Sequence, residues 1–206
     1  MRESNRGARE PVLFATSNRG KLEEARTILA PFGLSVEQYD GKGIEIQADT
    51  NSEVAAFASK GAAEAARRPV LVEDAGLYVD SLRGFPGPYS AYAFKTVGVL
   101  GIIALIRSPP EKAKGRKASF VSSLAYCAPL GEPRLFEGSA RGTITTKPRG
   151  KKGFGFDPIF LPDGGAKTFG ELTLEEKCAV SHRAVAMRKF ANWYLSADRR
   201  RGREWF

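Results

Sequence analysis

Two long segments in which apolar and polar residues alternate constrain the fold most strongly. They run from Ala118 to Ala128 and from Pro133 to Thr145, and the turn-forming sequence LGEP joins them. A period of two is that of a β-strand, whose successive side chains point to opposite faces of a sheet. The sequence therefore predicts two long strands connected by a short turn.

The rest of the chain combines short apolar strands with segments of helical period. Strands are predicted at Val12–Thr16 and Pro69–Val72, and helices from about Leu22 up to Pro31, at Asn51–Arg67 and at Val99–Arg107. Helices and strands that mix without regular alternation favour an α/β fold, with a mixed sheet and helices packed around it.

Length and composition favour a single domain. The chain has 206 residues, 42% of them hydrophobic, which suits one sizeable domain or one domain split into two lobes by a cleft. We expect a disordered extension at 1–10, one domain at 11–197 and a basic tail at 198–206. No segment approaches the roughly 18 apolar residues that span a bilayer, and no signal peptide is recognisable, so we expect a cytoplasmic protein without a membrane partner. Cys127 and Cys178 lie in no metal-binding spacing and are expected to be reduced.

The charge balance is basic, with 32 Lys and Arg against 23 Asp and Glu, a net charge of +9. Such a surplus favours anionic partners in general. The basic residues concentrate at 107–117, 147–152 and 199–203. Solvated loops and a solvated tail explain most of them, and contact with nucleic acid is the less favoured interpretation.

Two adjacent acids, Glu73 and Asp74, follow the predicted strand Pro69–Val72 where it is expected to run into an Ala-Gly turn. An ionised acid beside a buried strand needs a partner, because desolvating a carboxylate costs several kcal/mol. Strand ends are also common mouths of ligand crevices. A divalent metal with a phosphorylated substrate is one hypothesis, and a pair of solvated turn acids is the alternative.

Glu45 is a second candidate for a metal site. It alternates with Ile44 and Ile46, so its side chain points away from theirs. Alone it is typical of a surface residue, but with Asp74 it could complete a site for Mg²⁺, which one or two carboxylates, waters and phosphates usually hold. Glu73 and Asp74 should face opposite sides of their strand, so only one of them can point at a given metal.

The sequence TSNRGK, Thr16–Lys21, joins a strand to a helix and has the layout of a phosphate-binding loop. The helix N-terminus offers free N–H groups and a positive dipole, and Lys21 adds a full charge. The loop matches neither GxxxxGK[ST] nor GxGxxG. An ordinary turn with a helix cap at Ser17 or Asn18 explains it equally simply.

Two segments near the C-terminal end carry further candidates. In GFGFD, Phe154 or Phe156 could stack on a base, although a turn with core phenylalanines is the alternative. In TLEEKCAVSHR, one unbroken helix would point Lys177 and Arg183 roughly 120° apart. We therefore predict a break at Ala179–Val180, with Ser181 capping a new helix that begins near His182.

Taken in order, TSNRGK, GIEIQ, VLVEDAGLYVDSLRGFPGPYSAY, GFGFDPIF and FGELTLEEKCAVSHR closely resemble the inosine triphosphate pyrophosphatase family. The resemblance covers Val12 to about Leu195. It implies an elongated twisted mixed sheet with two lobes around a deep cleft. It also implies Mg²⁺-dependent hydrolysis of ITP, dITP or XTP to the monophosphate and pyrophosphate, by a cytosolic homodimer.

The resemblance also implies roles for individual residues. Asp74 matches the proton acceptor and, with Glu45, the metal ligands. Apart from the resemblance, Glu73 is the alternative to Asp74 as the catalytic residue that orients or deprotonates the attacking water. The residues that match substrate contacts are Thr16, Ser17, Asn18, Arg19, Gly20, Lys21, Ala75, Phe154, Gly155, Phe156, Asp157, Lys177, His182 and Arg183.

This chain departs from the family pattern at two basic positions. Ala58 stands where many relatives have a lysine, and Ala91 lies in the turn where many have arginine or lysine. Lys95 or Lys60 could replace the missing phosphate charge. Two further functions stay open: a pyrophosphatase for other modified nucleotides, and a basic nucleic-acid-binding module.

Overall fold

The computed structural model describes residues 9–41, 44, 46–106 and 113–201. In this part of the chain a 7-stranded sheet has the order β2-β1-β3-β5-β6-β7, with β4 paired to β3. The strands are β1 Val12–Ala15, β2 Val36–Tyr39, β3 Val70–Val79, β4 Pro86–Gly87, β5 Lys117–Cys127, β6 Arg134–Ile144 and β7 Phe160–Pro162. β2, β1 and β3 are parallel, and the other pairings are antiparallel. The predicted mixed sheet and its long strand pair are confirmed.

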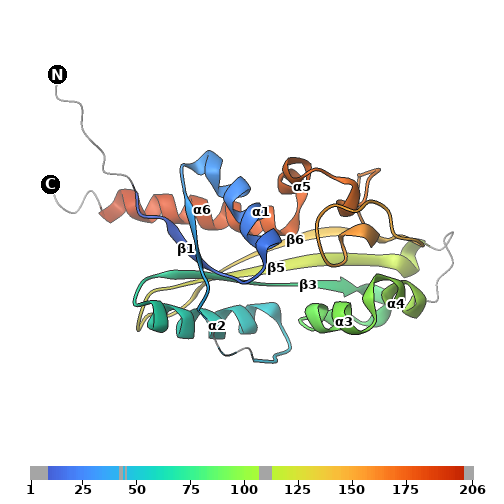
Figure 1. The fold of residues 1–206 in the computed structure, drawn as a ribbon, viewed down its shortest axis with the longest axis horizontal. Helices are drawn as coiled ribbons and strands as arrows, with labels where there is room; N and C mark the ends of the chain where they lie inside the picture. Colours follow the sequence, from blue (N-terminus) through green and yellow to red (C-terminus); the bar gives the residue numbers. More distant parts are fainter. Residues whose placement is uncertain (1–8, 42–43, 45, 107–112, 202–206) are drawn as a thin grey trace, which may run out of the picture.

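Helices cover both faces of this sheet. They are α1 Arg19–Leu29, α2 Asn51–Ala66, α3 Ser90–Thr96, α4 Gly98–Leu105, α5 Leu174–Val180 and α6 His182–Arg201, with 3₁₀ turns at Ala30–Phe32, Asp80–Leu82, Ala113–Arg116, Asp157–Ile159 and Phe169–Glu171. Figure 1 shows α1, α5 and α6 on one side of the long strands and α2, α3 and α4 on the other. The molecule is elongated along β3, β5 and β6, as expected, and its division into two lobes stays a prediction.

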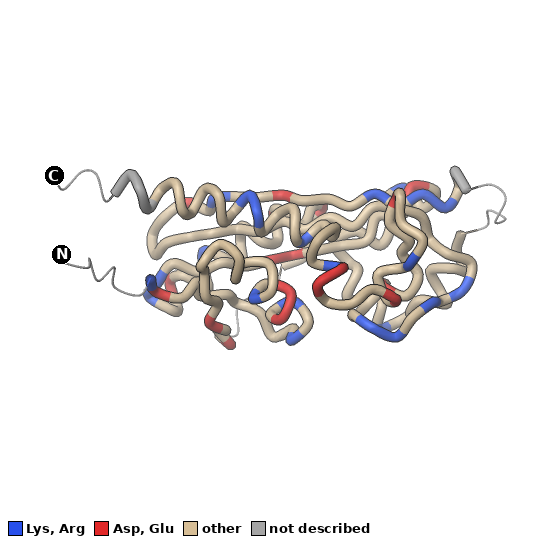
Figure 2. Tube along the Cα trace, turned by 90° about the horizontal axis from the view of Figure 1, so that it is seen from above, with Lys and Arg blue, Asp and Glu red and all other residues tan. Residues whose placement is uncertain are grey.

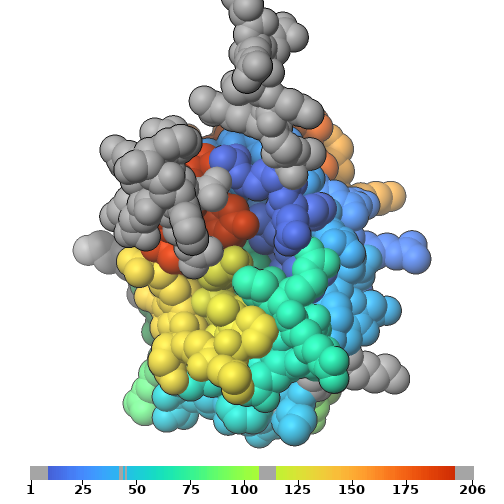
Figure 3. Space-filling view, turned by 90° about the vertical axis from the view of Figure 1, so that its left-hand side faces the viewer, coloured from blue at the N-terminus to red at the C-terminus, as the bar shows by residue number. Residues whose placement is uncertain are grey.

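The buried core follows these layers. One cluster packs α1 and α6 against the sheet through residues such as Phe14, Leu71 and Phe190. Another joins α2 to the opposite face through Ala63 and Val70. A third cluster lies where β5, β6 and β7 meet α3 and α4. Figure 3 shows the end of the molecule where the turn between β5 and β6 lies beside α2 and the start of β3.

Strand β3 is longer than predicted. It does not stop at Val72 before an Ala-Gly turn but continues to Val79, so Glu73 and Asp74 lie within a strand. The reason is long-range pairing, since β3 is matched to β5 from Val70 opposite Cys127 to Val79 opposite Ala118. Gly76 is needed there because a Cβ would lie 2.2 Å from the carbonyl oxygen of Gly87.

The predicted break between two C-terminal helices is present, but it lies at Ser181, and Ala179 and Val180 still belong to α5. α5 ends at Val180, and Ser181 has an extended backbone (φ −76°, ψ 159°) before α6 begins at His182. The Ser181 hydroxyl accepts a hydrogen bond from the N–H of Ala184 at 3.2 Å, which caps the new helix. α6 reaches Arg201, so the segment predicted as a tail is helical at its start.

Several smaller predictions are also settled. The helix predicted at Val99–Arg107 corresponds to α4, but the preceding turn also contains a helix, α3, which the pattern did not predict. Cys127 and Cys178 are free and buried, as expected. Among the described residues, no helix combines the length and apolar character needed to cross a membrane. Residues 1–8 and Arg107 lie outside the described residues.

Candidate active site

A chain of ion pairs runs through the interior between α1, β3, α5 and α6. Its links are Asp157–Lys177 (2.5 Å), Lys177–Glu24 (2.7 Å), Glu24–Arg183 (2.5 Å), Arg183–Glu73 (2.8 Å) and Glu73–Lys21 (3.6 Å). The side chains are buried except that of Lys21, which is 17% exposed. Positive and negative charges alternate along the chain, so each buried ion has a partner of opposite sign.

Local structure explains how these charges meet. Lys21 and Glu24 lie three residues apart on α1 and therefore on neighbouring positions of one helix face. The break at Ser181 turns the chain between Lys177 and Arg183, so both side chains reach the carboxylate of Glu24. An unbroken helix would have separated them, as the sequence analysis anticipated.

The ion pairs determine the charge states of the buried acids. Burial alone would raise the pKa of Glu73, but the charges of Arg183 and Lys21 and hydrogen bonds from Arg183 and Ser122 lower it to about 2. The pKa of Glu24 is likewise lowered, because Arg183 and Lys177 outweigh the effect of burial. Glu24 and Glu73 are therefore ionised at neutral pH. At the end of the network, burial raises the pKa of Asp157 above its usual 3.8, and the charge of Lys177 opposes this rise.

Asp74 lies on the opposite face of β3 from Glu73. Its carboxylate accepts a hydrogen bond of 2.5 Å from Nδ2 of Asn51 on α2, whereas Glu73 binds Arg183 on α6. The prediction that these neighbours point to opposite sides is confirmed. Burial raises the pKa of Asp74 above its usual 3.8, and the charge of Lys21 and the bond from Asn51 oppose this rise.

A hollow of about 330 Å³ brings many of the predicted residues together. The predicted site residues that line it are Asn18, Lys21, Asp74, Ala75, Phe154, Gly155, Asp157, Lys177, His182 and Arg183. Residues from α3 and the segment before it, including Pro88, Ala91 and Lys95, complete the wall. Segments that are far apart in the sequence thus share one cavity.

Other predicted residues lie outside this hollow in the described part of the chain. Glu73 is shielded, and the oxygens of its carboxylate accept hydrogen bonds from Ser122 and Arg183. Thr16, Ser17 and Arg19 belong to the loop and first turn of α1 but do not line the hollow. In the loop, the Thr16 hydroxyl accepts a hydrogen bond from the N–H of Asn18, and Asn18 caps α1 by accepting one from the N–H of Lys21. Glu45 lies outside the described residues.

The two phenylalanines of GFGFD have different environments. Phe156 is 3% exposed and belongs to the core with Ile159 and Phe160, which is the alternative that the sequence left open for one of these phenylalanines. Phe154 is half-buried and lines both the hollow and a neighbouring one of about 440 Å³ that contains Glu24 and Gly20. The Lys177 ammonium lies 4.6 Å from the centre of the Phe154 ring.

His182 is buried and neutral. Its ring stacks on Phe120 with centroids 4.7 Å apart. Burial, together with the nearby charge of Arg183, lowers its pKa well below 6.5. Among the described side chains, its Nδ1 is the buried polar atom that lacks a hydrogen-bond partner. A ligand in the hollow could satisfy that atom.

Comparison with known proteins identifies the family. A sequence profile of the Ham1 family matches residues 12–193. The chain belongs to the Ham1 family. Proteins named dITP/XTP pyrophosphatase from Methanopyrus kandleri and Thermococcus kodakarensis are 50% and 49% identical to it over 183 and 182 residues, covering 89% and 88% of this chain and 95% and 96% of theirs. The structure of a HAM1 protein from Coxiella burnetii superposes with a TM-score of 0.79 at 28% identity, covering 91% of this chain and 100% of that one.

Of the two predicted metal ligands in this Ham1-family chain, only Asp74 is among the described residues. Among the described residues, no group of three or more His, Cys, Asp and Glu side chains is arranged to hold a metal ion. Asp74 nevertheless contributes a half-buried carboxylate to the hollow. One such group suits Mg²⁺, which commonly takes its remaining ligands from waters and substrate phosphates.

The sequence analysis did not identify two polar residues of this Ham1-family site, Glu24 and Asn51. Both are buried, at 2% and 1% exposure. The sequence does contain a signal for the burial of Glu24, because Glu24 lies four residues before Ile28 and the two residues share one helix face. Asn51 carries no comparable signal, because only the approach of α2 to β3 brings it to Asp74.

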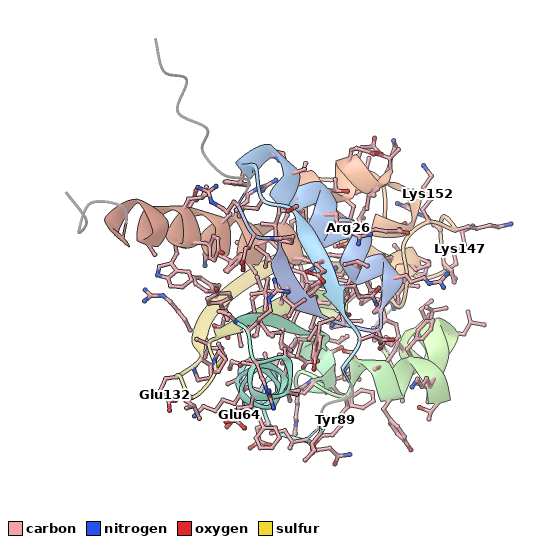
Figure 4. The ribbon with its side chains drawn as sticks, turned by 60° about the vertical axis from the view of Figure 1, so that its left-hand side comes forward. Arg26, Glu64, Tyr89, Glu132, Lys147 and Lys152 are labelled. Atoms are coloured by element: carbon pink, nitrogen blue, oxygen red, sulfur yellow. The ribbon has the colours of Figure 1, made fainter. Side chains whose placement is uncertain are left out.

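Lys95 and Lys60, the two candidate replacements for the basic residues missing at Ala58 and Ala91, have different environments. Lys95 lines the hollow. Lys60 instead pairs with Glu132 at 2.8 Å, on the surface. Figure 4 shows Glu132 beside the part of α2 that carries Glu64, at the opposite side of the molecule from Lys147 and Lys152.

Proposed function

We propose that this chain hydrolyses non-standard purine nucleoside triphosphates (dITP, ITP and XTP) to the nucleoside monophosphate and pyrophosphate. Relatives named dITP/XTP pyrophosphatase are aligned with at least 88% of its length. The observation that carries the proposal is that Asn18, Lys21 and Asp74 line one hollow. A helix N-terminus, a cation and a carboxylate in one cavity are what hydrolysis of a polyphosphate requires.

The triphosphate binds at the start of α1 in this proposal. The first turn offers N–H groups and the positive end of the helix dipole. Lys21 adds a full charge, and its ammonium is held in place by the carbonyl oxygen of Glu73 at 3.1 Å. On the opposite wall Lys95 supplies a second cation, in place of the basic groups missing at Ala58 and Ala91.

Asp74 accepts a proton from the attacking water. The water oxygen bonds to the α-phosphorus as the bond from that phosphorus to the oxygen bridging the β-phosphate breaks. Lys21 then neutralises charge on the departing pyrophosphate. Asp74 and Glu45 would hold Mg²⁺, which would supply further charge neutralisation. Glu73 does not share the proton transfer, because Ser122 and Arg183 already occupy its oxygens.

The base stacks on Phe154 in the proposed complex. Inosine and xanthosine present a 6-keto oxygen, which accepts a hydrogen bond from Arg183 or from the neutral ring of His182. Adenine presents an amine there, so a donor of the protein would face another donor. The site therefore favours 6-keto purines over adenine.

Measuring pyrophosphate release from dITP, ITP, XTP, GTP and ATP, with and without Mg²⁺, tests the proposal. We expect release from the first three that depends on Mg²⁺ and is much slower with ATP. Equal rates on ATP and ITP would contradict the proposed base selection, and no release from any purine would overturn the proposed activity.

The same substrate panel, extended to modified pyrimidine nucleotides, distinguishes this proposal from the alternative of a pyrophosphatase for other modified nucleotides.

A nucleic-acid-binding function has less support. Figure 2 shows basic positions scattered along the chain and interleaved with acidic ones. In the 147–152 stretch, Arg149 is paired with Glu171 at 3.0 Å. Salt-dependent binding of an oligonucleotide by an enzymatically inactive protein would favour that alternative.

We also propose that the chain forms a homodimer in the cytoplasm, where nucleotide pools are found. α3 and α4 expose large apolar side chains, among them Tyr92 at 70%, Leu100 at 67% and Leu105 at 47%. Exposed apolar patches commonly mark interfaces between copies of a protein. Light scattering should give twice the chain mass, and Leu100→Asp should shift it to the monomer. A monomeric wild-type protein would contradict this proposal.

A further inference from the structure

Asn51 is a buried amide in direct contact with the carboxylate assigned to the chemistry. It is the first residue of α2, and the preceding Thr50 caps that helix in a capping box with Glu53. Its Nδ2 donates to Oδ2 of Asp74 at 2.5 Å. The capped helix start is rigid, so Asn51 is held at a defined position relative to β3.

Tyr78 holds the oxygen end of the Asn51 amide. Its hydroxyl donates to Oδ1 of Asn51 in a short hydrogen bond. Tyr78 lies four residues after Asp74 on β3, so both side chains point to the same face of the sheet. Because a carboxylate only accepts hydrogen bonds, Asp74 selects the NH₂ group of Asn51, and Oδ1 is left to accept from the Tyr78 hydroxyl. Tyr78 thereby holds the other end of the amide.

The backbone leaves room for this arrangement. A Cβ at Gly76, between the two residues, would lie 3.2 Å from Oδ1 of Asn51 and still closer to the carbonyl of Gly87. The carboxylate is thus held by Asn51 while it lines the hollow that contains Lys21.

We propose that Asn51 is a positioning residue, anchored at its amide oxygen by Tyr78, which holds one oxygen of Asp74 so that the carboxylate presents a fixed face to the water and the metal ion. This inference rests on the proposed function for its chemistry. Misplacing a reacting group by about 1 Å can reduce a rate by about 10²-fold, so the effect of losing this contact is measurable.

Three variants test the proposal, with dITP as substrate. Asn51→Leu removes the amide at similar volume and should lower kcat by about 10- to 100-fold with little change in KM. Asn51→Asp places a second acid against Asp74 and should lower kcat further. Tyr78→Phe removes only the hydroxyl and should lower kcat by about three- to tenfold.

Ser59→Ala is the matched control. Ser59 lies on the same helix, is fully buried, and its hydroxyl donates to the carbonyl of Ala56, away from Asp74. This variant removes a buried polar contact of α2 without touching Asp74, so it reports the effect of altering the helix interior alone. Its kcat should equal that of the wild type, whatever its melting temperature.

A second readout does not depend on activity. Titration calorimetry with Mn²⁺, a divalent ion that also binds carboxylate sites, should show weaker binding by Asn51→Leu and unchanged binding by Ser59→Ala. If the wild type binds Mn²⁺ but does not hydrolyse dITP, ITP or XTP, the proposed function fails, and weaker binding by Asn51→Leu still supports the positioning role. Unchanged Mn²⁺ binding by Asn51→Leu, no Mn²⁺ binding by the wild type, or equal losses of kcat in Asn51→Leu and Ser59→Ala would overturn the positioning role.

Discussion

Replacing Glu24 by glutamine removes one negative charge from the buried ion network at nearly constant size. Glu24 lies between Lys177 and Arg183, and its side chain is 2% exposed. The variant leaves one positive charge uncompensated, which costs about 3–5 kcal/mol. The glutamine oxygen still accepts a hydrogen bond, so we expect about 3 kcal/mol. At about 2–4 °C per kcal/mol for a chain of this size, the melting temperature should fall by about 6–12 °C.

Differential scanning calorimetry measures this fall, and Glu132→Gln is the matched control. Glu132 also pairs with a lysine, Lys60, at 2.8 Å, but its side chain is 86% exposed. An exposed pair contributes at most about 1 kcal/mol, so the control should move the melting temperature by less than about 4 °C. Equal shifts in the two variants would refute the argument that burial determines the cost.

Three further predictions follow from the site. Asp74→Asn should lower kcat for dITP by about 10²- to 10⁴-fold without changing the melting temperature, and near-normal turnover would exclude Asp74 from the proton transfer. Phe154→Ala should raise KM in a stable protein, whereas Phe156→Ala should lose about 3–5 kcal/mol of stability. Kinetics measure the first effect and thermal melts the second. The reverse pattern would show that the roles of the two phenylalanines, substrate contact and core packing, have been exchanged. Arg183 and Lys21 lower the pKa of Glu73 from 4.5 to about 2 despite its burial. Its stabilising contribution is therefore complete above about pH 4.5 and is lost as the pH falls towards 2. Urea unfolding should show this loss in the wild type, and stability that stays constant down to pH 3 would contradict it.

Local patterns predicted much of the fold correctly. The alternation in β5 and β6 and the turn between them are properties of neighbouring residues, and so is the serine that caps α6. The end of β3 was not predicted correctly. Ala75 and Gly76 are typical of a turn, but pairing with β5, more than forty residues later in the sequence, keeps them in a strand.

The residues of the candidate site were likewise predicted only in part. The loop before α1 and the acids of β3 were recognisable by residue type and order, and ten of the predicted substrate and catalytic residues line one hollow: Asn18, Lys21, Asp74, Ala75, Phe154, Gly155, Asp157, Lys177, His182 and Arg183. Phe154 and Phe156 could not be told apart, because both are aromatic residues beside glycine and only packing with Ile159 and Phe160 assigns one of them to the core.

The sequence by itself determined the long strand pair and most of the helices, the break between α5 and α6, and the set of charged residues available to a site, because these depend on residues close together in the chain. Only the tertiary structure decided which charges are paired. Glu24 meets Arg183, and Asn51 meets Asp74, through contacts between separate helices and strands. Such contacts depend on how whole elements pack across the sheet, and no local pattern in the sequence specifies that packing.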